Sequence, residues 1–411
     1  MGQGRFALGV ALLVVVGTVA AGAIAAPTNG GAPSGDQADA VDQAALQANE
    51  SGPNDSDAGT ASANGTNESA SGATTGGQSP ESCDYAALYD RTIDSVVSVQ
   101  TGAGIGSGFV YRTAENGTGY VVTNAHVVGD SDEVVVQLAD GESRTGEVVG
   151  RDELSDLAVI RIDETPDAAE ALPVADEPAD PGTAVAALGN PFGLDETITH
   201  GIVSGVNRSM PTTRGYAVPN VVQTDAPISP GNSGGPLVTC DGTVVGVNTA
   251  GIAAQGAENI GFSVSATLID RVVPALIEDG EYEYAYLGVA ATPVTPPIAE
   301  ANDLNATEGL YVVRTADGSP AADALQEAGE NETAGGFSVP VGGDVIVAID
   351  GQPVTSGEEL SSYLVTETSP GENVTLTVLR DGERQEIEVT LDERPAPASG
   401  PTGPPTGGLP G

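Results

Sequence analysis

Short runs rich in valine and isoleucine recur along the middle of the chain, and glycine, proline, asparagine and aspartate separate them. Such runs are typical of strands joined by tight turns, and their close spacing does not suit strands that alternate with helices. The first set of predicted strands covers residues 95–100, 108–112, 120–123, 134–138, 157–162, 183–188 and 243–248. We therefore expect a mainly β fold built from barrels or sandwiches.

Helical periodicity is confined to a few segments. Residues 85–94 form one, and residues 266–278 form another, in which Leu268, Val272 and Leu276 have helical spacing. A second set of strands, with a short helix at 357–365, covers residues 309–314, 344–350, 373–380 and 385–391. The two sets predict two β-rich domains, one over residues 83–283 and one over residues 284–393.

The two ends of the chain differ in composition from its middle. Residues 6–26 are uncharged and end in an A-x-A pattern for an export peptidase, but a run of about 20 apolar residues can also span a bilayer. Residues 1–26 are therefore expected to be a signal peptide or an N-terminal membrane anchor. The acidic Ser/Gly/Asn-rich linker 27–82 and the Pro/Gly-rich tail 394–411 are expected to be disordered. The protein is then exported, either secreted or anchored to the membrane.

Charge and composition narrow the possible partners. The chain has 58 acidic residues against 13 basic ones, a formal charge of -45, and every basic residue is arginine. Nucleic acid and anionic membranes would repel such a chain. The acidic excess extends over both predicted domains, and its self-repulsion weakens in concentrated salt, so the composition resembles that of proteins from extreme halophiles.

The histidine and cysteine counts also exclude some classes of protein. Two histidines and two cysteines are too few for a conventional zinc domain or a disulfide-dense scaffold. We expect no metal and no organic cofactor.

A candidate nucleophile lies in residues 231–236, Gly-Asn-Ser-Gly-Gly-Pro. Glycines beside Ser233 allow a tight turn whose N–H groups point at one spot, as the stabilisation of a tetrahedral oxyanion requires. The motif resembles the nucleophile loop of chymotrypsin-like serine proteases. His126 follows one predicted strand and Asp156 opens another, so the order His, Asp, Ser is the chymotrypsin order.

These residues predict the roles of a catalytic triad. Ser233 attacks the scissile carbonyl, His126 is the general base and then the acid, and Asp156 fixes the imidazole tautomer. The N–H groups of Gly231 and Ser233 form the oxyanion hole, with Asn232 between them. Each residue alone could be an ordinary turn or core residue, but three motifs in one order favour catalysis.

Four further segments extend the resemblance beyond the superfamily. They are residues 189–193 (GNPFG), 201–204 (GIVS), 223–226 (QTDA) and 259–262 (NIGF). With the triad motifs, this set resembles the HtrA/Deg (DegP/DegQ-like) family of exported quality-control proteases. The resemblance implies two six-stranded barrels with the triad in the cleft between them. It also implies a pocket for small aliphatic side chains, formed by Asn259, Ile260, Gly261 and Phe262.

The second domain is similar to the PDZ domains of the same family. Tyr286, Leu287, Gly288 and Val289 resemble their carboxylate-binding loop, and residues 343–351 resemble their central strand. Such a domain binds a peptide as an added strand and holds its C-terminal carboxylate with loop N–H groups. Residues 326–341 depart from the family, and we expect this polar, glycine-rich insertion to be a loop, so the resemblance does not define the shape of the groove or its peptide preference.

The family resemblance also implies a homotrimer. The chain has one PDZ domain, and only a short connection joins strands 108–112 and 120–123, which does not suit a larger cage. Tyr85 and Tyr89, on one face of the first predicted helix, are candidates for the trimer contact, with ordinary packing as the alternative.

Cys83 and Cys240 are predicted to form a disulfide, because an exported chain with two cysteines favours one, although two buried thiols are the alternative. His200, which no partner aspartate or nucleophile motif accompanies, is interpreted as structural.

Together, the sequence predicts an exported serine endoprotease that degrades unfolded or damaged proteins and binds peptide C-termini at its PDZ domain. The alternative is a peptide-binding chaperone or scaffold whose protease site is normally inactive.

Overall fold

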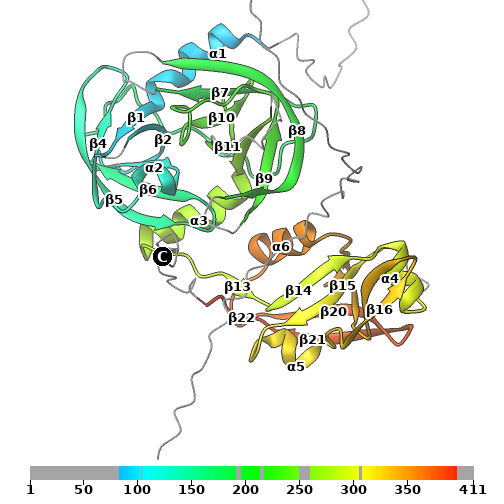
Figure 1. The fold of residues 1–411 in the computed structure, drawn as a ribbon. Coiled ribbons are helices and arrows are strands. Elements are labelled where there is room, and N and C mark those ends of the chain that lie inside the picture. Colours follow the sequence, from blue (N-terminus) through cyan, green and yellow to red (C-terminus); the bar gives the residue numbers. More distant parts are fainter. Residues whose placement is uncertain are drawn as a thin grey trace, which may run out of the picture. The chain divides into compact units, whose positions relative to one another are not determined.

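The computed structural model describes residues 83–102, 104–190, 196–212, 217–249, 260–304 and 308–395. The expected signal peptide or anchor, the acidic linker and nearly all of the C-terminal tail lie outside these residues. Within the described ranges, no helix is long and apolar enough to cross a membrane. The prediction of a mainly β fold is confirmed, because two closed six-stranded barrels are followed by a further set of smaller sheets (Figure 1).

The first barrel is built from the valine-rich runs of the N-terminal half. Its strands are β1 (Val96–Gln100), β2 (Ile105–Thr113), β3 (Gly119–Thr123), β4 (Glu133–Gln137), β5 (Ser143–Asp152) and β6 (Leu157–Ile162). They close in the order β1-β2-β3-β6-β5-β4. Buried and exposed residues alternate along β4, as expected for a strand with one face toward a barrel interior. Val99, Val121, Val136 and Ile160 are fully buried in the core of this barrel.

The second barrel carries the predicted nucleophile turn. Its strands are β7 (Ala184–Gly189), β8 (Thr197–Pro211), β9 (Ala217–Thr224), β10 (Pro236–Thr239), β11 (Val244–Thr249) and β12 (Gly261–Ser265), and they close in the order β10-β11-β12-β9-β8-β7. The long strand β8 shows several register shifts against β9. Such bulges bend a strand and increase its twist, which helps a sheet to close into a barrel.

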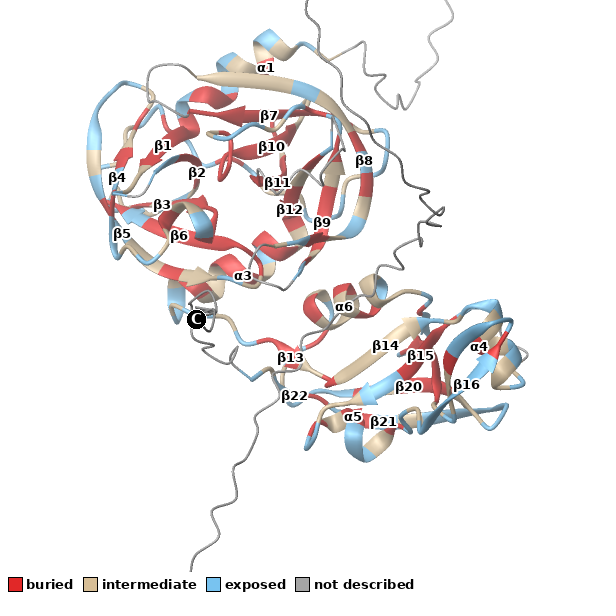
Figure 2. Ribbon diagram, viewed as in Figure 1, coloured by how far each residue is buried: buried red, intermediate tan, exposed pale blue. Residues whose placement is uncertain are grey.

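The helices of this part are α1 (Tyr85–Thr92), the 3₁₀ turn η2 (Ile93–Ser95), α2 (Ala125–Val128) and α3 (Ala266–Glu278). The Ser265 side chain accepts the N–H of Leu268 and caps the start of α3. α3 packs against β5 and β6 of the first barrel and against β11 and β12 of the second. α3 buries Leu268, Val272 and Leu276, the three residues whose spacing predicted this helix. Figure 2 shows the buried positions along the barrel strands.

The C-terminal part has its own core. Its elements are β13 (Ala285–Tyr286), β14 (Val289–Pro293), α4 (Pro296–Ala301), β15 (Leu310–Thr315), α5 (Pro320–Ala324), β16 (Glu330–Ala334), β17 (Phe337–Val341), β18 (Val345–Ile349), β19 (Gln352–Pro353), α6 (Gly357–Thr366), β20 (Asn373–Arg380), β21 (Glu383–Thr390) and β22 (Asp392–Glu393). The main sheet has the order β14-β15-β18-β20-β21, with β19 paired to β18, and β13 pairs with β22. β14 therefore lies at an edge of the main sheet.

The expectation of a loop at residues 326–341 is wrong, because most of this insertion is a β-hairpin. β16 and β17 pair in register around Gly335 and Gly336, whose φ angles of 57° and 85° fit a two-residue turn of the kind that favours glycine. The hairpin packs on α4 and buries Ala334 and Val339. The polar, glycine-rich composition concealed a hairpin that buries only one of its faces.

Candidate active site

Strand pairing brings His126 and Asp156 together. β3 and β6 are antiparallel, with Thr123 opposite Ala158, so the residues that follow β3 meet the residues that precede β6. His126 lies in α2, just after β3, and Asp156 immediately precedes β6. Two side chains that are 30 residues apart in the sequence thus lie at the same end of the first barrel.

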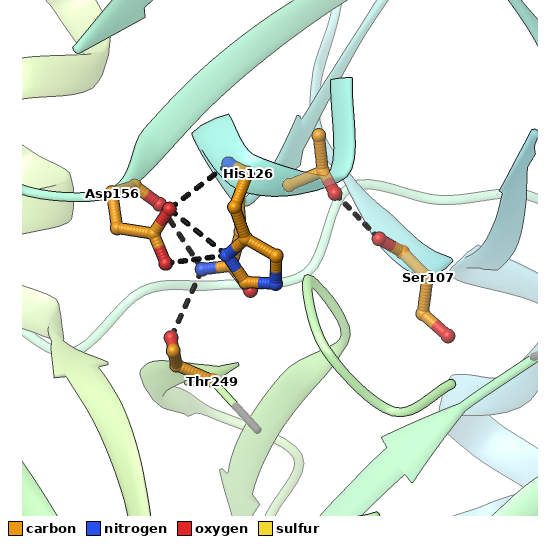
Figure 3. A network of polar contacts seen from close by, with 6 residues as sticks. Ser107, His126, Asp156 and Thr249 are labelled. Atoms are coloured by element: carbon orange, nitrogen blue, oxygen red, sulfur yellow. Dashed lines mark hydrogen bonds and ion pairs between the residues drawn. The ribbon is translucent and has the colours of Figure 1, made fainter. Parts of the chain in front are cut away.

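The Asp156 carboxylate contacts His126 in two places (Figure 3). Its Oδ2 and Oδ1 lie 2.8 Å and 3.0 Å from the ring Nδ1, and Oδ1 also accepts the backbone N–H of His126 at 3.0 Å. An ionised carboxylate only accepts, so this contact favours the neutral tautomer that has its proton on Nδ1 and leaves Nε2 as the acceptor. The His126 side chain is 42% exposed and that of Asp156 only 12%, so the imidazole can be reached while its partner is covered.

The backbone at Asp156 is held in an unusual conformation. Its φ of 58° lies in the left-handed region, where residues other than glycine are uncommon. The Asp156 carbonyl accepts the N–H of Ala125 at 3.1 Å and the side-chain amide of Asn124 at 3.0 Å. The same Asn124 amide nitrogen donates to Thr249 Oγ1 at 3.0 Å, and Thr249 lies on β11. Asn124 thus links the Asp156 backbone to the second barrel.

The residues before Asp156 form a second hydrogen-bonded group. Asp152 Oδ2 accepts the backbone N–H of Ser155 at 2.8 Å, the Ser155 hydroxyl at 2.5 Å and the Tyr284 hydroxyl. Burial, and then the negative charge of Asp152, raise the pKa of Tyr284 well above its ordinary value. The Tyr284 hydroxyl therefore keeps its proton, and its bond to Asp152, to a higher pH than an exposed phenol would.

Ser233 lies in a tight turn between β9 and β10. Gly231 and Gly234 have φ angles of 108° and 87°, which a residue with a side chain rarely adopts. The N–H of Gly235 donates to the Asn232 carbonyl at 3.0 Å and closes the turn. The glycines of the sequence motif are therefore required by the backbone shape.

The Ser233 turn packs against the first barrel. A Cβ atom at Gly234 would lie 2.2 Å from Thr123 Oγ1, and one at Gly106 would lie 2.7 Å from the Val127 side chain and 3.1 Å from the Ser233 carbonyl. These close approaches place the turn beside the segment that carries α2. The three motifs singled out in the sequence thus come from two barrels and meet at one place.

Asn232 is fixed from the side of the second barrel. The Thr197 hydroxyl donates to Asn232 Oδ1 at 2.8 Å, and a Cβ atom at Gly189 would lie 2.9 Å from Asn232 Cα. The Asn232 residue is only 4% exposed. The Asn232 side chain therefore links the Ser233 turn to the start of β8.

Sequence reasoning missed four residues that hold this site. They are Ser107, Asn124, Thr197 and Thr249. Each is a small polar residue within a strand or at a strand end, and such residues are common at these positions for many reasons. The one available signal was that some of them lie close to the recognised motifs in the sequence. Asn124 is the clearest case, because it lies two residues before His126.

The predicted specificity pocket is only partly described. Asn259 lies outside the described residues, Ile260 is 44% exposed, and Gly261 and Phe262 begin β12. A Cβ atom at Gly261 would lie 2.9 Å from the Ile228 side chain. The same position lies 3.0 Å from the Ala226 carbonyl oxygen, so Gly261 packs closely against the segment before the Ser233 turn.

The predicted carboxylate-binding loop joins β13 to the edge strand β14. Leu287 is buried, and its carbonyl accepts the N–H of Ala321 at 2.9 Å. Gly288 has a φ of 77°, and a Cβ atom there would lie 2.2 Å from the Ser319 side chain. The loop thus needs glycine at this position. Tyr286 is the last residue of β13, before this loop, and Val289 is the first residue of β14, after it.

A disulfide joins Cys83, just before α1, to Cys240, just after β10, with Cα atoms 5.5 Å apart. Arg91 on α1 also donates to the Cys240 carbonyl at 2.8 Å. These contacts fasten the N-terminal helix to the second barrel.

The two tyrosines of α1 contact the start of β8. Tyr85 stacks on His200 with ring centroids 4.4 Å apart, and the Tyr89 hydroxyl donates to Glu196 at 2.7 Å. His200 is exposed and pairs with Ala186 across the β7–β8 ladder. Among the described residues, no group of three His, Cys, Asp or Glu residues is arranged to hold a metal ion.

Two family models match the chain. The model for the trypsin-like peptidase domain matches residues 106–247, and the model for the PDZ domain matches residues 285–391. These matches define a trypsin-like peptidase fold followed by a PDZ domain. Among solved structures, the chain is similar to the HtrA-type protease AlgW with tripeptide, at 32% identity and a TM-score of 0.60, over 77% of this chain and 99% of that one. The chain therefore belongs to the HtrA family.

Curated relatives agree with this family. The chain is 36% identical over 291 residues to the periplasmic pH-dependent serine endoprotease DegQ of Escherichia coli, which covers 70% of this chain. It is 34% identical over 310 residues to the serine protease Do-like HtrA of Bacillus subtilis, over 72% of this chain. The chain spans 59% and 65% of the length of these two relatives.

Proposed function

We propose that this chain is a serine endoprotease in which Ser233, His126 and Asp156 form the catalytic triad. The observation that carries the proposal is the bond between the Asp156 carboxylate and His126 Nδ1, beside the glycine-rich Ser233 turn. Nε2 takes the proton from Ser233 Oγ as this oxygen attacks the scissile carbonyl. It then passes the proton to the leaving amine, and a water molecule hydrolyses the acyl-enzyme in the same way.

The oxyanion hole in this proposal consists of the N–H groups of Gly231 and Ser233, with Asn232 between them. Donors fixed before the reaction stabilise the charge that develops on the carbonyl oxygen without further reorganisation. The buried position of Asn232 and its bond from Thr197 support a rigid turn. Loss of one such donor typically lowers kcat by about 10²- to 10³-fold.

Substrate selection is proposed to involve Asn259, Ile260, Gly261 and Phe262. The closeness of Gly261 to Ile228 supports a shallow apolar pocket suited to small aliphatic side chains. Such a pocket discriminates weakly between similar side chains, since one methylene contributes only about 1–3 kcal/mol. This suits an enzyme whose substrates are many different unfolded or damaged proteins.

The PDZ domain is proposed to bind peptide C-termini. β14 lies at the edge of the main sheet and pairs only with β15 among the described strands, so its other edge can accept an added strand. The loop Tyr286–Leu287–Gly288–Val289 immediately precedes this edge and would hold the terminal carboxylate with its N–H groups. Solved HtrA-type relatives contain a tripeptide or a decapeptide, which supports peptide binding.

The location and assembly are also proposals. The disulfide between Cys83 and Cys240 and the periplasmic relatives support an exported protein, secreted or anchored through residues 1–26. A homotrimer is proposed from the family resemblance. Because Tyr85 stacks on His200 and the Tyr89 hydroxyl bonds Glu196 of the same chain, a trimer contact would use the parts of the two side chains that these contacts leave uncovered.

The test of the protease proposal is hydrolysis of casein in molar KCl by the wild type and by Ser233→Ala. We expect cleavage by the wild type and none by the variant. Equal cleavage by both would exclude Ser233 as the nucleophile. Absence of cleavage by both, with aggregation of an unfolded protein still suppressed, would favour the chaperone instead.

A further inference from the structure

Ser107 on β2 lies between the two barrels and is fully buried. Its backbone N–H donates to the Ser233 carbonyl at 2.8 Å, and its hydroxyl donates to the Gly231 carbonyl at 2.6 Å. One residue of the first barrel thus binds both ends of the segment that carries the proposed nucleophile. Ser107 is among the residues drawn in Figure 3.

The Ser107 hydroxyl donates to Gly231, because a carbonyl oxygen can only accept, and it accepts from a second partner. The backbone N–H of Asn190 donates to Ser107 Oγ at 2.8 Å, so the single hydroxyl proton is left for the Gly231 carbonyl. Thr123 Oγ1 in turn donates to the Ser107 carbonyl at 2.6 Å. Every polar group of Ser107 is therefore engaged, and its position is fixed from β3 and from the end of β7.

These contacts matter because of which carbonyls they bind. The two carbonyls belong to Gly231 and Ser233, the same residues whose N–H groups are the proposed oxyanion donors. Gly231, at a φ of 108°, has no side chain to limit its backbone, and glycine populates several backbone regions at little cost. The hydroxyl bond fixes the peptide plane between Gly231 and Asn232, and the backbone bond fixes the plane between Ser233 and Gly234. The donor N–H groups of Gly231 and Ser233 lie next to these fixed planes, which limits how far their directions can change.

We infer that Ser107 is a positioning residue that holds the Gly231–Ser233 segment in the conformation that binds the oxyanion. The inference rests on the serine mechanism proposed above. Ser107 touches no substrate atom in this role. It acts through the turn and should affect the transition state more than substrate binding, because the oxyanion forms only as the reaction proceeds.

The chain offers a matched control on the neighbouring strand. Ser98 on β1 is directly opposite Ser107 in the β1–β2 pairing and is also fully buried. The Ser98 hydroxyl has no hydrogen-bond partner among the described residues. Replacing it with alanine removes an unsatisfied group and should be neutral or slightly stabilising. Ser98→Ala and Ser107→Ala thus make the same chemical change at adjacent buried positions.

The experiment measures kcat and KM for a short chromogenic peptide, and the inhibition constant of a peptidyl aldehyde that forms a tetrahedral adduct. For Ser107→Ala we expect kcat to fall about tenfold and the aldehyde to bind weaker by a similar factor, with KM changed less than twofold. Ser98→Ala should match the wild type in all three. If Ser107→Ala does not fold, Ser107→Cys keeps a side chain with a weaker donor at this position and should show the same pattern.

A folded Ser107→Ala with wild-type kcat and aldehyde binding would overturn the inference. So would a variant whose loss appears only in thermal stability, since that would make Ser107 merely structural. An inactive wild type, or one whose activity survives Ser233→Ala, would instead overturn the proposed triad. The failures of the two proposals are therefore distinguishable.

Discussion

The Asp156 carboxylate bonds both the backbone N–H and the ring Nδ1 of His126, at 3.0 Å and 2.8 Å. The backbone bond fixes the carboxylate at the start of α2, and the ring bond then fixes the plane and the tautomer of the imidazole. Asp156 makes both contacts from a left-handed backbone, with a φ of 58°. An energetically unusual backbone is thus maintained at the residue that orients the proposed general base.

Asp156→Asn should leave the fold intact and lower kcat by about 10⁴-fold, with a much smaller change in KM. The asparagine oxygen can still accept the His126 backbone N–H, but its amide NH₂ then faces Nδ1. The ring is driven to the other tautomer, in which Nε2 carries a proton and cannot accept one. Steady-state kinetics on a peptide substrate measure the effect, with circular dichroism as the check on folding. A kcat within tenfold of the wild type would contradict the role given to Asp156.

Loss of the Cys83–Cys240 disulfide should destabilise the protein. The two cysteines are 157 residues apart, and the chain-entropy estimate for closing so long a loop is about 5 kcal/mol. Urea unfolding of Cys83→Ser/Cys240→Ser should therefore show a midpoint well below that of the wild type. A reducing agent should lower the wild-type midpoint and leave that of the double variant unchanged. Equal midpoints for the oxidised wild type and the variant would show that the disulfide does not stabilise the fold.

Alkaline pH should destabilise the protein through its tyrosines. Burial, and then the Glu196 carboxylate, raise the pKa of Tyr89 to about 12, whereas the unfolded phenol ionises near 10.0. A folded pKa above the unfolded one gives stability that is complete below pH 10 and is lost as the pH rises toward 12. The thermal midpoint should fall over this window, and less steeply in Tyr89→Phe. Identical slopes for variant and wild type would mean that Tyr89 does not contribute to this linkage.

High salt should stabilise the fold. The formal charge of -45 produces self-repulsion, and molar salt shortens the Debye length to about 3 Å. The thermal midpoint should rise strongly between 0.1 M and 2 M KCl. Sucrose serves as the control, because it favours compact states without screening charge. A midpoint that responds equally to sucrose and to KCl, or to neither, would contradict the proposed adaptation to salt.

The sequence predicted most where apolar residues alone decide the structure. The helix 266–278 was predicted with the bounds that the structure gives. Leu268, Val272 and Leu276 follow one another at intervals of four residues, which places them on one face of a helix. Seven strands of the two barrels were located to within three residues, namely β1 to β4, β6, β7 and β11, whereas β5, β9, β10 and β12 were not predicted. The long strand β8 was missed because its Thr, His, Asn and Arg residues show no period of two, and because bulges break its alternation.

The motifs of the candidate site could be found from the sequence, but not the contacts that hold them. Ser233, His126 and Asp156 each occur in a recognisable local pattern. Ser107 lies more than 100 positions before Ser233, and only the closure of two barrels brings their backbones to 2.8 Å. Such a contact depends on tertiary packing, which leaves no local signal. The hairpin at 330–341 was missed although Gly335 and Gly336 are a two-residue turn signal, because the polar residues of β16 show no alternation of apolar and polar positions.

The central claim is that Ser233 is a nucleophile activated by His126. Its most direct test is labelling by a fluorophosphonate probe in molar KCl, followed by peptide mapping with mass spectrometry. The proposed triad predicts one label per chain, attached to Ser233, at a rate that falls at least a hundredfold in His126→Ala. Labelling at another serine, or at an equal rate in His126→Ala, would contradict it.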